Sequence, residues 1–524
     1  MQDVYLILVV VLFALAITDL VVGVSNDAVN FLNSAIGSKV ASRKVIMIIA
    51  SLGIFIGATF SSGIMEVARK GIFFPDQFLF TEVMIIFLAV MITDIILLDT
   101  FNTFGLPTST TVSIVFEILG AATVVASMKV IGNGDTLDKL AQYINTDSAL
   151  AIISGIFLSV GVAFTVGMIV QYLSRIIFSF EYYKRLKYVG AIWSGFALAA
   201  LTYFLLVKGA KGASFISEEQ AVWFQEHALT VYITSFIVWS VTLQVIHSFL
   251  QFNILRIVVL FGTFALAMAF AGNDLVNFIG VPIAGMESFQ AWSASGQEAE
   301  EYLMDSLNKP VQTPTYLLLI AGFIMVLTLW FSKKARKVTE TQVDLSRQED
   351  GEERFSANIV SRTIVKGAVS VGAATVKVVP NGLLERIEHN FKNLDKIDEK
   401  NKPAFDLVRA SVNLTVASML ISLATSLKLP LSTTYVSFMV AMGAALADRA
   451  WGRESAAYRV AGVLNVILGW FMTALIAFSV SGLLAFLIYY FGLGTVGVLV
   501  IIVIFMIYRT FRYYQAIEKK KGLK

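Results

Sequence analysis

The chain of 524 residues contains no cysteine and only three histidines. Without cysteine it forms no disulfide, no thiolate metal site and no cysteine nucleophile. Three histidines leave little for a histidine-based metal centre. Charged residues are also scarce, at 15% of the chain, and a net charge of +3 creates no strong field toward nucleic acid. These absences argue against a disulfide scaffold, a metalloenzyme and a nucleic-acid-binding protein.

In place of charge, the sequence has long apolar runs. Hydrophobic residues make up 57% of the chain, and the mean hydropathy is +0.76. A helix needs about 20 apolar residues to cross the hydrocarbon core of a bilayer. Four runs of about this length or longer carry no charge, at 45–65, 149–174, 188–207 and 314–331. We therefore predict an all-α polytopic membrane protein that uses no enzyme cofactor. Its first apolar segment is expected to be a retained helix rather than a cleaved signal peptide.

The connections between the apolar runs alternate in charge. The basic ones lie at 38–44, 184–187 and 333–337, and the acidic ones at 131–147 and 285–309. Because cytoplasmic loops are rich in lysine and arginine, we predict the basic connections inside and the acidic ones outside. The polar segment 333–405, with an amphipathic helix near its end, and the basic C-terminus are then cytoplasmic. The expected location is the cell (inner) membrane.

Two short motifs each occur twice, in the same order. Asn-Asp-x-Val-Asn-Phe begins at Asn26 and again 247 residues later (26 to 273), at Asn273. Leu-Pro-x-Ser-Thr-Thr begins at Leu106 and again 323 residues later (106 to 429), at Leu429. The spacings differ by about the length of segment 333–405. The chain thus reads as two homologous halves, the second of which carries an insertion.

The loop charges indicate how the halves are oriented. A basic loop follows the first Asn-Asp motif, whereas an acidic loop follows the second, and the Ser-Thr-Thr segments show the reverse order. We therefore predict two inverted-topology repeats, an arrangement typical of secondary transporters with a site near the membrane midplane. Channels also contain inverted repeats, so the pattern indicates transport in general. The predicted parts are a first transmembrane repeat (1–185), connecting helices (186–248), the first part of the second repeat (249–332), a cytoplasmic loop (333–405), the rest of the second repeat with the last helix (406–511), and a basic cytoplasmic tail (512–524).

Each Asn-Asp motif places a carboxylate inside an apolar run, at a cost of at least ~2.5–3.5 kcal/mol. No lysine or arginine lies nearby in sequence to pair with Asp27 or Asp274. The small residues before each motif favour a helix break, where free carbonyls and the Asn and Asp oxygens suit an alkali cation. On a helix, Asn26 and Asn30 are one turn apart and converge with Asp27 on one point. The alternative is structural, with interhelical hydrogen bonds from Asn and a protonated Asp.

Leu-Pro-x-Ser-Thr-Thr is a helix-start signal. Ser109 and Ser432, or the threonines beside them, are expected to cap the helices that follow. Three hydroxyls and several free N–H groups then point at one spot, with the positive end of the helix dipole behind them. That is an anion site made of neutral donors. The polar segments before each motif, 97–105 and 420–428, are predicted to be short arms of re-entrant helical hairpins. The alternative is a plain kinked helix.

An oxyanion bound at these helix starts would be repelled by Asp27 and Asp274 unless cations or protons neutralise them. The two motifs together therefore predict that anion binding depends on a cation, which is the logic of a symporter. A cation antiporter would leave the Ser-Thr-Thr motifs unexplained. A lipid-phosphate enzyme would need a nucleophile–base pair or a metal cluster, and none of the histidines falls in either motif. A purely structural or receptor role does not predict inverted repeats.

The four motifs, "GVSNDAVN", "GLPTSTT", "AGNDLVN" and "KLPLSTT", resemble those of the inorganic phosphate transporter (PiT) family. The resemblance extends over the whole chain. It implies about 12 membrane segments including the two hairpins, a homodimer, and uptake of inorganic phosphate coupled to a cation gradient by alternating access. By matching position, it implies phosphate ligands at Ser109, Thr110, Thr111, Ser432, Thr433 and Thr434, and sodium ligands at Asn26, Asp27, Asn30, Asn273, Asp274 and Asn277.

The sequence departs from the family pattern after each Ser-Thr-Thr and before the second Leu-Pro, where Lys428 replaces the family's glycine. Many members have histidine after Ser-Thr-Thr, where this chain has Val112 and Tyr435. Losing that proton carrier favours sodium as the coupling ion. Further acids lie in the apolar runs of the first half and have no acidic counterparts in the second; they are Asp19, Asp94, Asp99 and Glu117. A proton-coupled phosphate transporter and a sulfate permease of the same architecture are the alternatives, since sulfate is also a tetrahedral dianion.

Overall fold

The architecture was analysed in a computed structural model of the chain. It describes residues 2–59, 61, 71–104, 108–208, 217–309, 313–345, 347, 359, 361–363, 365–366, 390–391, 403–427, 429, 431–449 and 456–522. The prolines of the two Leu-Pro motifs and most of segment 333–405, including its predicted amphipathic helix, lie outside the described residues. The comparison between sequence and structure below is restricted accordingly.

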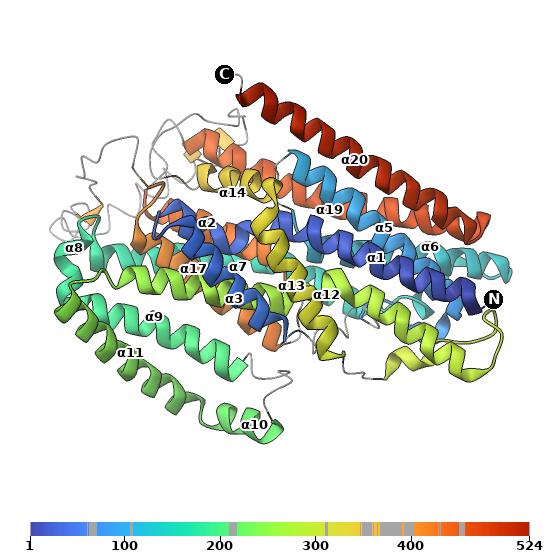
Figure 1. Ribbon diagram of the computed structural model, residues 1–524, viewed down its shortest axis with the longest axis horizontal. Helices are drawn as coiled ribbons and strands as arrows, with labels where there is room; N and C mark the ends of the chain where they lie inside the picture. Colours follow the sequence, from blue (N-terminus) through green and yellow to red (C-terminus); the bar gives the residue numbers. More distant parts are fainter. Residues whose placement is uncertain are drawn as a thin grey trace.

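The described part of the chain is helical and contains no strand, only two isolated bridges between loops. Most helices run along the long axis of the molecule (Figure 1). In order they are α1 (Gln2–Asp27), α2 (Val29–Gly37), α3 (Arg43–Ala58), α5 (Phe80–Phe104), α6 (Thr110–Gly132), α7 (Thr146–Phe178), α8 (Tyr182–Arg185), α9 (Ala191–Tyr203), α10 (Glu218–Glu226), α11 (Ala228–Leu250), α12 (Leu255–Ser295), α13 (Thr315–Phe331), α14 (Lys333–Leu345), α17 (Leu407–Ser426), α18 (Thr433–Ala447), α19 (Ala456–Phe491) and α20 (Gly494–Gly522).

Ten of these helical segments in the described residues are long and apolar enough to cross a membrane. The bent pair α13–α14 raises the number to eleven, and α18 is a shorter apolar helix of 15 residues. In hydrocarbon every backbone N–H and C=O must bond within its own segment, which is why such a chain folds as helices. The predicted all-α polytopic membrane protein is confirmed, with a number of spans close to the twelve expected.

The arms predicted as short hairpin segments are longer than expected. Of the first segment, residues 97–104 form the end of α5, a helix of 25 residues, and of the second, residues 420–426 form the end of α17, a helix of 20 residues. Both helices are long enough to span the membrane. The expectation of short arms was wrong because the polar residues near these ends bond to neighbouring helices and do not end the helical ladder. The re-entrant course and the inverted orientation of the halves stay predictions.

The helices approach one another closely at small residues. A Cβ added to Gly443 on α18 would lie 2.1 Å from the carbonyl oxygen of Phe164 on α7. A Cβ added to Gly120 on α6 would lie 2.2 Å from the carbonyl oxygen of Phe478 on α19. Because lipid tails are as apolar as leucine, membrane helices associate through such close van der Waals packing. These glycines therefore set the distance between helix axes around the centre of the molecule.

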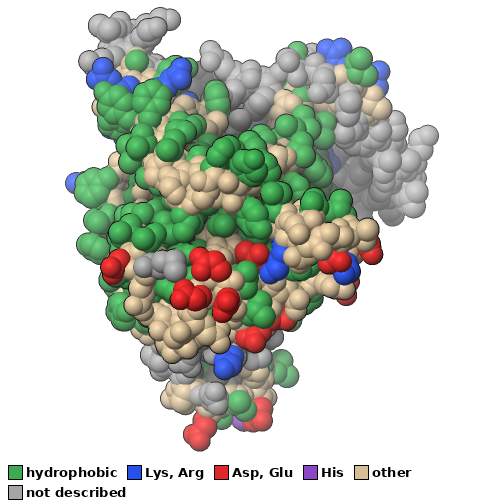
Figure 2. Space-filling view, turned by 90° about the vertical axis from the view of Figure 1, so that its right-hand side faces the viewer, with side chains coloured by type: hydrophobic (Ala, Val, Ile, Leu, Met, Phe, Trp, Pro, Cys, Tyr) green, Lys and Arg blue, Asp and Glu red, His purple; other side chains and the backbone are tan. Residues whose placement is uncertain are grey.

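The acidic connections meet at one end of the molecule. Phe73 bridges to Ile144 and Leu79 bridges to Leu303, so the loops at 71–79, 133–145 and 296–309 touch one another. Figure 2 looks onto this end, where acidic side chains gather. The exposed ones include Asp138, Asp147, Glu298, Glu300, Glu301 and Asp305. The two acidic connections predicted on the outer side of the membrane, at 131–147 and 285–309, are thus joined through the loop at 71–79 at one end of the structure.

The basic connections lie in the other half of the molecule, where α8 is at the far left and α2 and α14 are nearer the middle (Figure 1). The guanidinium of Arg175, at the end of α7, is fully buried and bonds to Asp406 and to Asp448, each at 2.7 Å. Asp406 caps the start of α17, Asp448 caps the end of α18, and Arg409 also reaches Asp448 at 3.0 Å. Removing one member of such a buried network costs about 3–5 kcal/mol because a charge is left uncompensated. This network ties α7, α17 and α18 together.

We expect Gly443→Ala to destabilise the protein by roughly 1–3 kcal/mol, because the methyl group would meet backbone that cannot move aside. Gly155→Ala, in α7, is the matched control, since nothing lies within 4 Å of its added Cβ. Alanine is the better helix former, so the control should melt at the same temperature or slightly higher. Thermal melting in detergent measures both. Equal melting temperatures would contradict the close approach of α7 and α18.

Candidate anion and cation site

The two Asn-Asp motifs differ in backbone conformation. Helix α1 ends at Asp27 and α2 begins at Val29, so the first motif lies at a break. The second motif lies inside the continuous helix α12, which runs from Leu255 to Ser295. The expected break is therefore present at the first motif and absent at the second. The interruption at the first motif is limited to Ala28, whose backbone keeps right-handed helical angles.

Both Ser-Thr-Thr motifs start helices, as predicted. Helix α6 begins at Thr110, and the Oγ of its N-cap residue Ser109 accepts a hydrogen bond from the N–H of Val112 at 3.1 Å. Helix α18 begins at Thr433, and the Oγ of Ser432 accepts from the N–H of Tyr435 at 3.0 Å. The capping role expected of the two serines is confirmed. The hydroxyls of the threonines beside them bond to other helices.

These threonine hydroxyls donate to the two carboxylates, and each carboxylate bonds to both helix starts. Asp27 accepts from the Oγ1 of Thr110 at 2.9 Å and from the Oγ1 of Thr434 at 3.0 Å. Asp274 accepts from the Oγ1 of Thr111 at 3.0 Å and also from the Oγ1 of Thr433. Residues more than 400 positions apart in the chain are thereby joined. Each Asp-bearing helix contacts one helix start from each half.

The second asparagine of each motif completes the cluster. The Nδ2 of Asn30 donates to the hydroxyl oxygens of Thr433 at 3.2 Å and Thr434 at 3.0 Å. The Nδ2 of Asn277 donates to those of Thr110 at 3.2 Å and Thr111 at 3.0 Å. Each threonine oxygen thus accepts from an amide while its hydrogen goes to a carboxylate. The result is a chain of donors that runs from Asn through Thr to Asp.

The first asparagine of each motif bonds to the segment before the helix start. Asn26 donates to the Oδ1 of Asn102 at 2.8 Å and accepts from the N–H of Thr108 at 3.0 Å. Asn273 donates to the carbonyl of Leu431 at 2.9 Å and accepts from the Oγ1 of Thr425 at 3.3 Å. Asn102 and Thr425 were not singled out from the sequence. The repeat spacing would have found them, since they are separated by the same 323 positions as the Ser-Thr-Thr motifs (102 to 425).

The cluster is buried, and its bonding partners among the described residues include no basic side chain. Every one of the twelve predicted ligands is at most 3% exposed; they are Asn26, Asp27, Asn30, Ser109, Thr110, Thr111, Asn273, Asp274, Asn277, Ser432, Thr433 and Thr434. Hydrogen bonds join the two aspartates, the second asparagine of each motif and the four threonines directly, and the two serines lie next to this cluster as helix caps. A carboxylate removed from water in this way depends on its hydrogen-bond donors.

The described residues contain no group of three or more His, Cys, Asp or Glu side chains arranged to hold a metal ion. The predicted metal-binding character therefore finds no support in a cluster of that type. What the cluster offers is two carboxylates with amide, hydroxyl and backbone oxygens around them. Those are hard oxygen ligands, which suit alkali and alkaline-earth cations better than transition metals.

The other acids of the first half divide into two groups. Asp19, Asp94 and Glu117 are fully buried and interact with one another, and Glu117 also accepts a hydrogen bond from Ser113 at 2.7 Å. Asp99 stands apart and pairs with Lys334 on α14 at 2.5 Å. None of the four bonds to the threonine cluster in the described hydrogen bonds. The sequence reading had left their roles open.

The chain is similar in sequence to known phosphate transporters and permeases. A family model described as "Phosphate transporter family" matches residues 23–342. "Putative phosphate permease TK2061" of Thermococcus kodakarensis is 28% identical over 280 residues, covering 52% of this chain and 65% of that protein. "Putative phosphate permease PF1020" of Pyrococcus furiosus is 26% identical over 280 residues, covering 52% and 64%. The match thus spans less than two thirds of these relatives' length.

Among solved structures, the fold is similar to one titled "The sodium-dependent phosphate transporter". The TM-score is 0.60 over 92% of this chain and 99% of that chain, with 15% sequence identity. At this identity the likeness concerns the fold. It covers both halves of the chain, including the parts beyond the family-model match.

We expect Thr434→Val to destabilise the protein by about 1–3 kcal/mol, because it leaves the buried carboxylate of Asp27 one donor short. Thr434→Ser keeps the hydroxyl and is the matched control. Thermal melting in detergent, with both variants purified in parallel, gives the difference. If Thr434→Val melts with Thr434→Ser at the wild-type temperature, the hydroxyl does not stabilise the carboxylate.

Proposed function

Because the chain belongs to the phosphate transporter family, we propose that it is a secondary active symporter that takes up inorganic phosphate together with sodium ions. The observation that supports this most directly is the pairing of two carboxylates with four threonine hydroxyls at two helix starts. The names of its relatives and of the similar structure agree with phosphate as the substrate and sodium as the co-substrate.

The proposed coupling follows from a competition for hydrogens. A threonine hydroxyl has one hydrogen to donate. In the cluster those hydrogens go to Asp27 and Asp274. A phosphate bound at the same helix starts needs them for its own oxygens, and it also meets repulsion from the two carboxylates. Sodium ions that take the carboxylates as ligands remove the repulsion and free the hydroxyls.

The proposed ligands are those of the two motifs. Phosphate is held by the threonine hydroxyls and by N–H groups at the starts of α6 and α18, with Ser109 and Ser432 fixing those starts as caps. Sodium is held by Asp27, Asp274 and the neighbouring Asn oxygens. No lysine or arginine bonds to the cluster in the described contacts, so the bound anion is released readily once sodium leaves. In the proposed alternating-access cycle, the site opens to one side of the membrane to bind both ions and then to the other side to release them.

We propose sodium rather than protons as the coupling ion, because this chain has Val112 and Tyr435 where many family members have histidine. Phosphate is preferred to sulfate because of the family match, since the donors alone fit either dianion. The proposal also includes inverted repeats, the division of the chain into the parts predicted above, a homodimer in the cell membrane, and a cytoplasmic location for segment 333–405 and the C-terminus.

We expect Asp27→Asn and Asp274→Asn each to abolish sodium-driven phosphate uptake, because the neutral amide cannot compensate a sodium ion. Radiolabelled phosphate uptake by proteoliposomes, with sodium and pH gradients imposed separately, measures this. Asp147→Asn, at an exposed acid of the acidic end, is the control and should retain uptake. Normal sodium-driven uptake by both site variants would rule out these aspartates as the sodium ligands. Uptake driven by the pH gradient alone would identify protons as the coupling ion.

We expect sodium to raise the affinity of the purified protein for phosphate by about 5–150-fold, the usual range of coupling between two sites. Phosphate binding is measured by calorimetry in sodium and in choline at equal ionic strength. Sulfate serves as the competing anion in the same titration. Equal phosphate affinity in choline would contradict the competition for threonine hydrogens. Tighter binding of sulfate than of phosphate would change the substrate assignment.

A further inference from the structure

Three buried acids meet outside the threonine cluster: Asp19 on α1, Asp94 on α5 and Glu117 on α6. All three are 0% exposed. The carboxyl group of Asp94 lies within hydrogen-bonding reach of those of Asp19 and Glu117, so it stands between the other two. We call these three residues the acid triad. None of them belongs to the repeated motifs, and the proposed transport does not use them.

Most oxygens of the acid triad receive no hydrogen bond in the part of the chain that the structure describes. These are both oxygens of Asp19, both of Asp94 and the Oε2 of Glu117. The hydroxyl of Ser113 has one hydrogen to donate, and it goes to the Oε1 of Glu117 at 2.7 Å. Ionised carboxylates in this setting are costly, because no protein donor replaces their hydration. The acid triad therefore needs a ligand that supplies hydrogen or positive charge.

The second half of the chain shows that packing does not require acids at these positions. By the two motif spacings, 247 positions for α1 and 323 for α5 and α6, the counterparts of the acid triad (19 to 266, 94 to 417 and 117 to 440) are Leu266, Ala417 and Val440. These three are at most 1% exposed. Apolar side chains thus fill the equivalent positions of α12, α17 and α18. The carboxyl groups of the first half point instead to a ligand that apolar side chains do not bind.

Contacts between α1 and α5 fix how far the acid triad lies from the sodium ligand proposed on α1. Asn102 follows Asp94 by eight positions (94 to 102), and Asn26 follows Asp19 by seven (19 to 26). Because Asn26 and Asn102 bond at 2.8 Å and the two acids are also in contact, α1 and α5 run in parallel. Eight residues separate Asp19 from Asp27, which places the acid triad about 12 Å along α1 from the sodium ligand.

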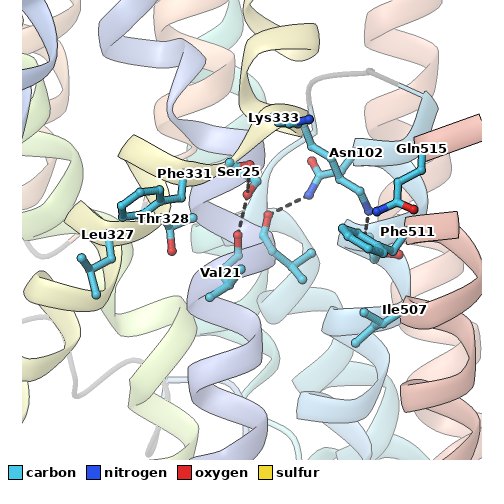
Figure 3. A pocket seen from close by; sticks show the side chains of 14 residues that line it. Val21, Ser25, Asn102, Leu327, Thr328, Phe331, Lys333, Ile507, Phe511 and Gln515 are labelled. Atoms are coloured by element: carbon cyan, nitrogen blue, oxygen red, sulfur yellow. Dashed lines mark hydrogen bonds and ion pairs between the residues drawn. The ribbon is translucent and has the colours of Figure 1, made fainter. Parts of the chain in front are cut away.

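The acid triad is separate from the pocket beside these helices. A pocket of about 530 Å³ lies between α1, α5, α13, α14 and α20, and Asn102 in its wall donates to the carbonyl of Val22 at 2.7 Å (Figure 3). Asp99, the ion-pair partner of Lys334, also lines this pocket. No member of the acid triad is among its lining residues. The acid triad therefore stays enclosed by protein and does not share that lysine.

The charged group that acts on the acid triad from outside it is a further acid. Asp27 interacts with Asp19 and with Asp94. Helices α12, α13, α14, α19 and α20 also pack against α1, α5 or α6. On α12 the charged residues are Arg256, Asp274 and Glu287, and on α19 Arg459; α13 has none, and those of α14 and α20 begin at Lys333 and Arg509. The principal interactions of the acid triad involve none of these residues.

We propose that the acid triad is a proton-binding site, in which protons shared between Asp94 and its two neighbours neutralise the buried charge. Two carboxylates in such contact cannot both be ionised, and a proton between them replaces repulsion with a hydrogen bond. A metal ion is the alternative ligand. It finds less support, because the described residues contain no group of three acids arranged to hold one.

The consequence for the site on α1 rests on the proposed function. One full charge about 12 Å away changes the affinity of Asp27 for a cation by about tenfold, at an effective dielectric constant of about 20. Each proton that leaves the acid triad adds one negative charge and therefore strengthens cation binding at Asp27. The acid triad thus makes the charge beside the proposed sodium site depend on pH.

The first test detects the protons on the purified full-length protein. Infrared difference spectra between ordinary and heavy water, recorded in choline buffer, show the C=O stretch of protonated carboxyl groups. We expect Asp94→Asn and Glu117→Gln each to lose intensity from this band. Glu82→Gln is the matched control, because Glu82 is also buried in α5 but is ion-paired with Lys129 at 2.8 Å. Removing that ionised group should leave the band unchanged.

The second test replaces the acid triad with its counterparts from the second half, in the triple variant Asp19→Leu, Asp94→Ala and Glu117→Val. Unfolding returns the carboxyl groups to water, where they release their protons at neutral pH. The folded wild type then binds more protons than the unfolded chain, so its stability falls as pH rises. Each such proton raises the unfolding equilibrium constant about tenfold per pH unit. Denaturant unfolding in detergent, from about pH 5 to about pH 8, should show a steeper loss for the wild type than for the triple variant.

Three results would overturn the proposal. One is a wild-type infrared band in both Asp94→Asn and Glu117→Gln. Another is a band from these acids that appears only after sodium is removed, which would identify sodium as their ligand. The third is the same pH dependence of unfolding in the wild type and the triple variant. Neither test follows transport or adds phosphate, so its failure leaves the proposed function untouched, and failure of the proposed function leaves both results unchanged.

Discussion

Two buried aspartates, which bond to no basic side chain in the part of the chain that the structure describes, are held by threonine hydroxyls from both halves of the chain. Asp27 and Asp274 each accept one hydroxyl hydrogen from α6 and one from α18. In a buried site such carboxylates are costly unless every oxygen finds a donor. The four helices that carry these residues must therefore meet at one point. Packing of the remaining helices must hold these four helices in that position.

The surrounding fold serves that requirement in two ways. Glycines at the contacts of α7 with α18 and of α6 with α19 let these helices approach until backbone touches backbone. At the basic end, the buried charges of Arg175, Asp406 and Asp448 lock the ends of α7, α17 and α18. The glycine contacts act through van der Waals packing, and the Arg175 network acts through ion pairs. Both hold the helix starts in fixed register with the aspartates.

The same cluster is the one on which the proposed transport depends. Its members satisfy one another's hydrogen bonds. Under the proposed function, a cation at the carboxylates and an oxyanion at the hydroxyls would replace these bonds. A site built from neutral donors and two acids would then favour binding both ions together over binding either alone.

Much of this could be predicted from local sequence. Long uncharged runs require membrane helices, because backbone groups in hydrocarbon must bond within their own segment. Ser109 and Ser432 as helix caps follow from residue type and position alone. The repeated motifs indicated which residues form the site. The sequence could not predict which side chains form hydrogen bonds between the two repeats, such as Asp27 with Thr434. Side chains more than 400 positions apart meet only through helix packing.

Local sequence also suggested a break at both Asn-Asp motifs, whereas only α1 breaks and α12 continues. Small residues precede both motifs, so residue type by itself does not distinguish the interrupted helix from the continuous one. The pairing of Asp99 with Lys334 and the pocket above it likewise depend on where α14 and α20 pack. Local chemistry thus determined which groups the chain carries into the membrane. Tertiary packing determined their partners, because hydrogen bonds and ion pairs form only between atoms brought within about 3 Å of each other.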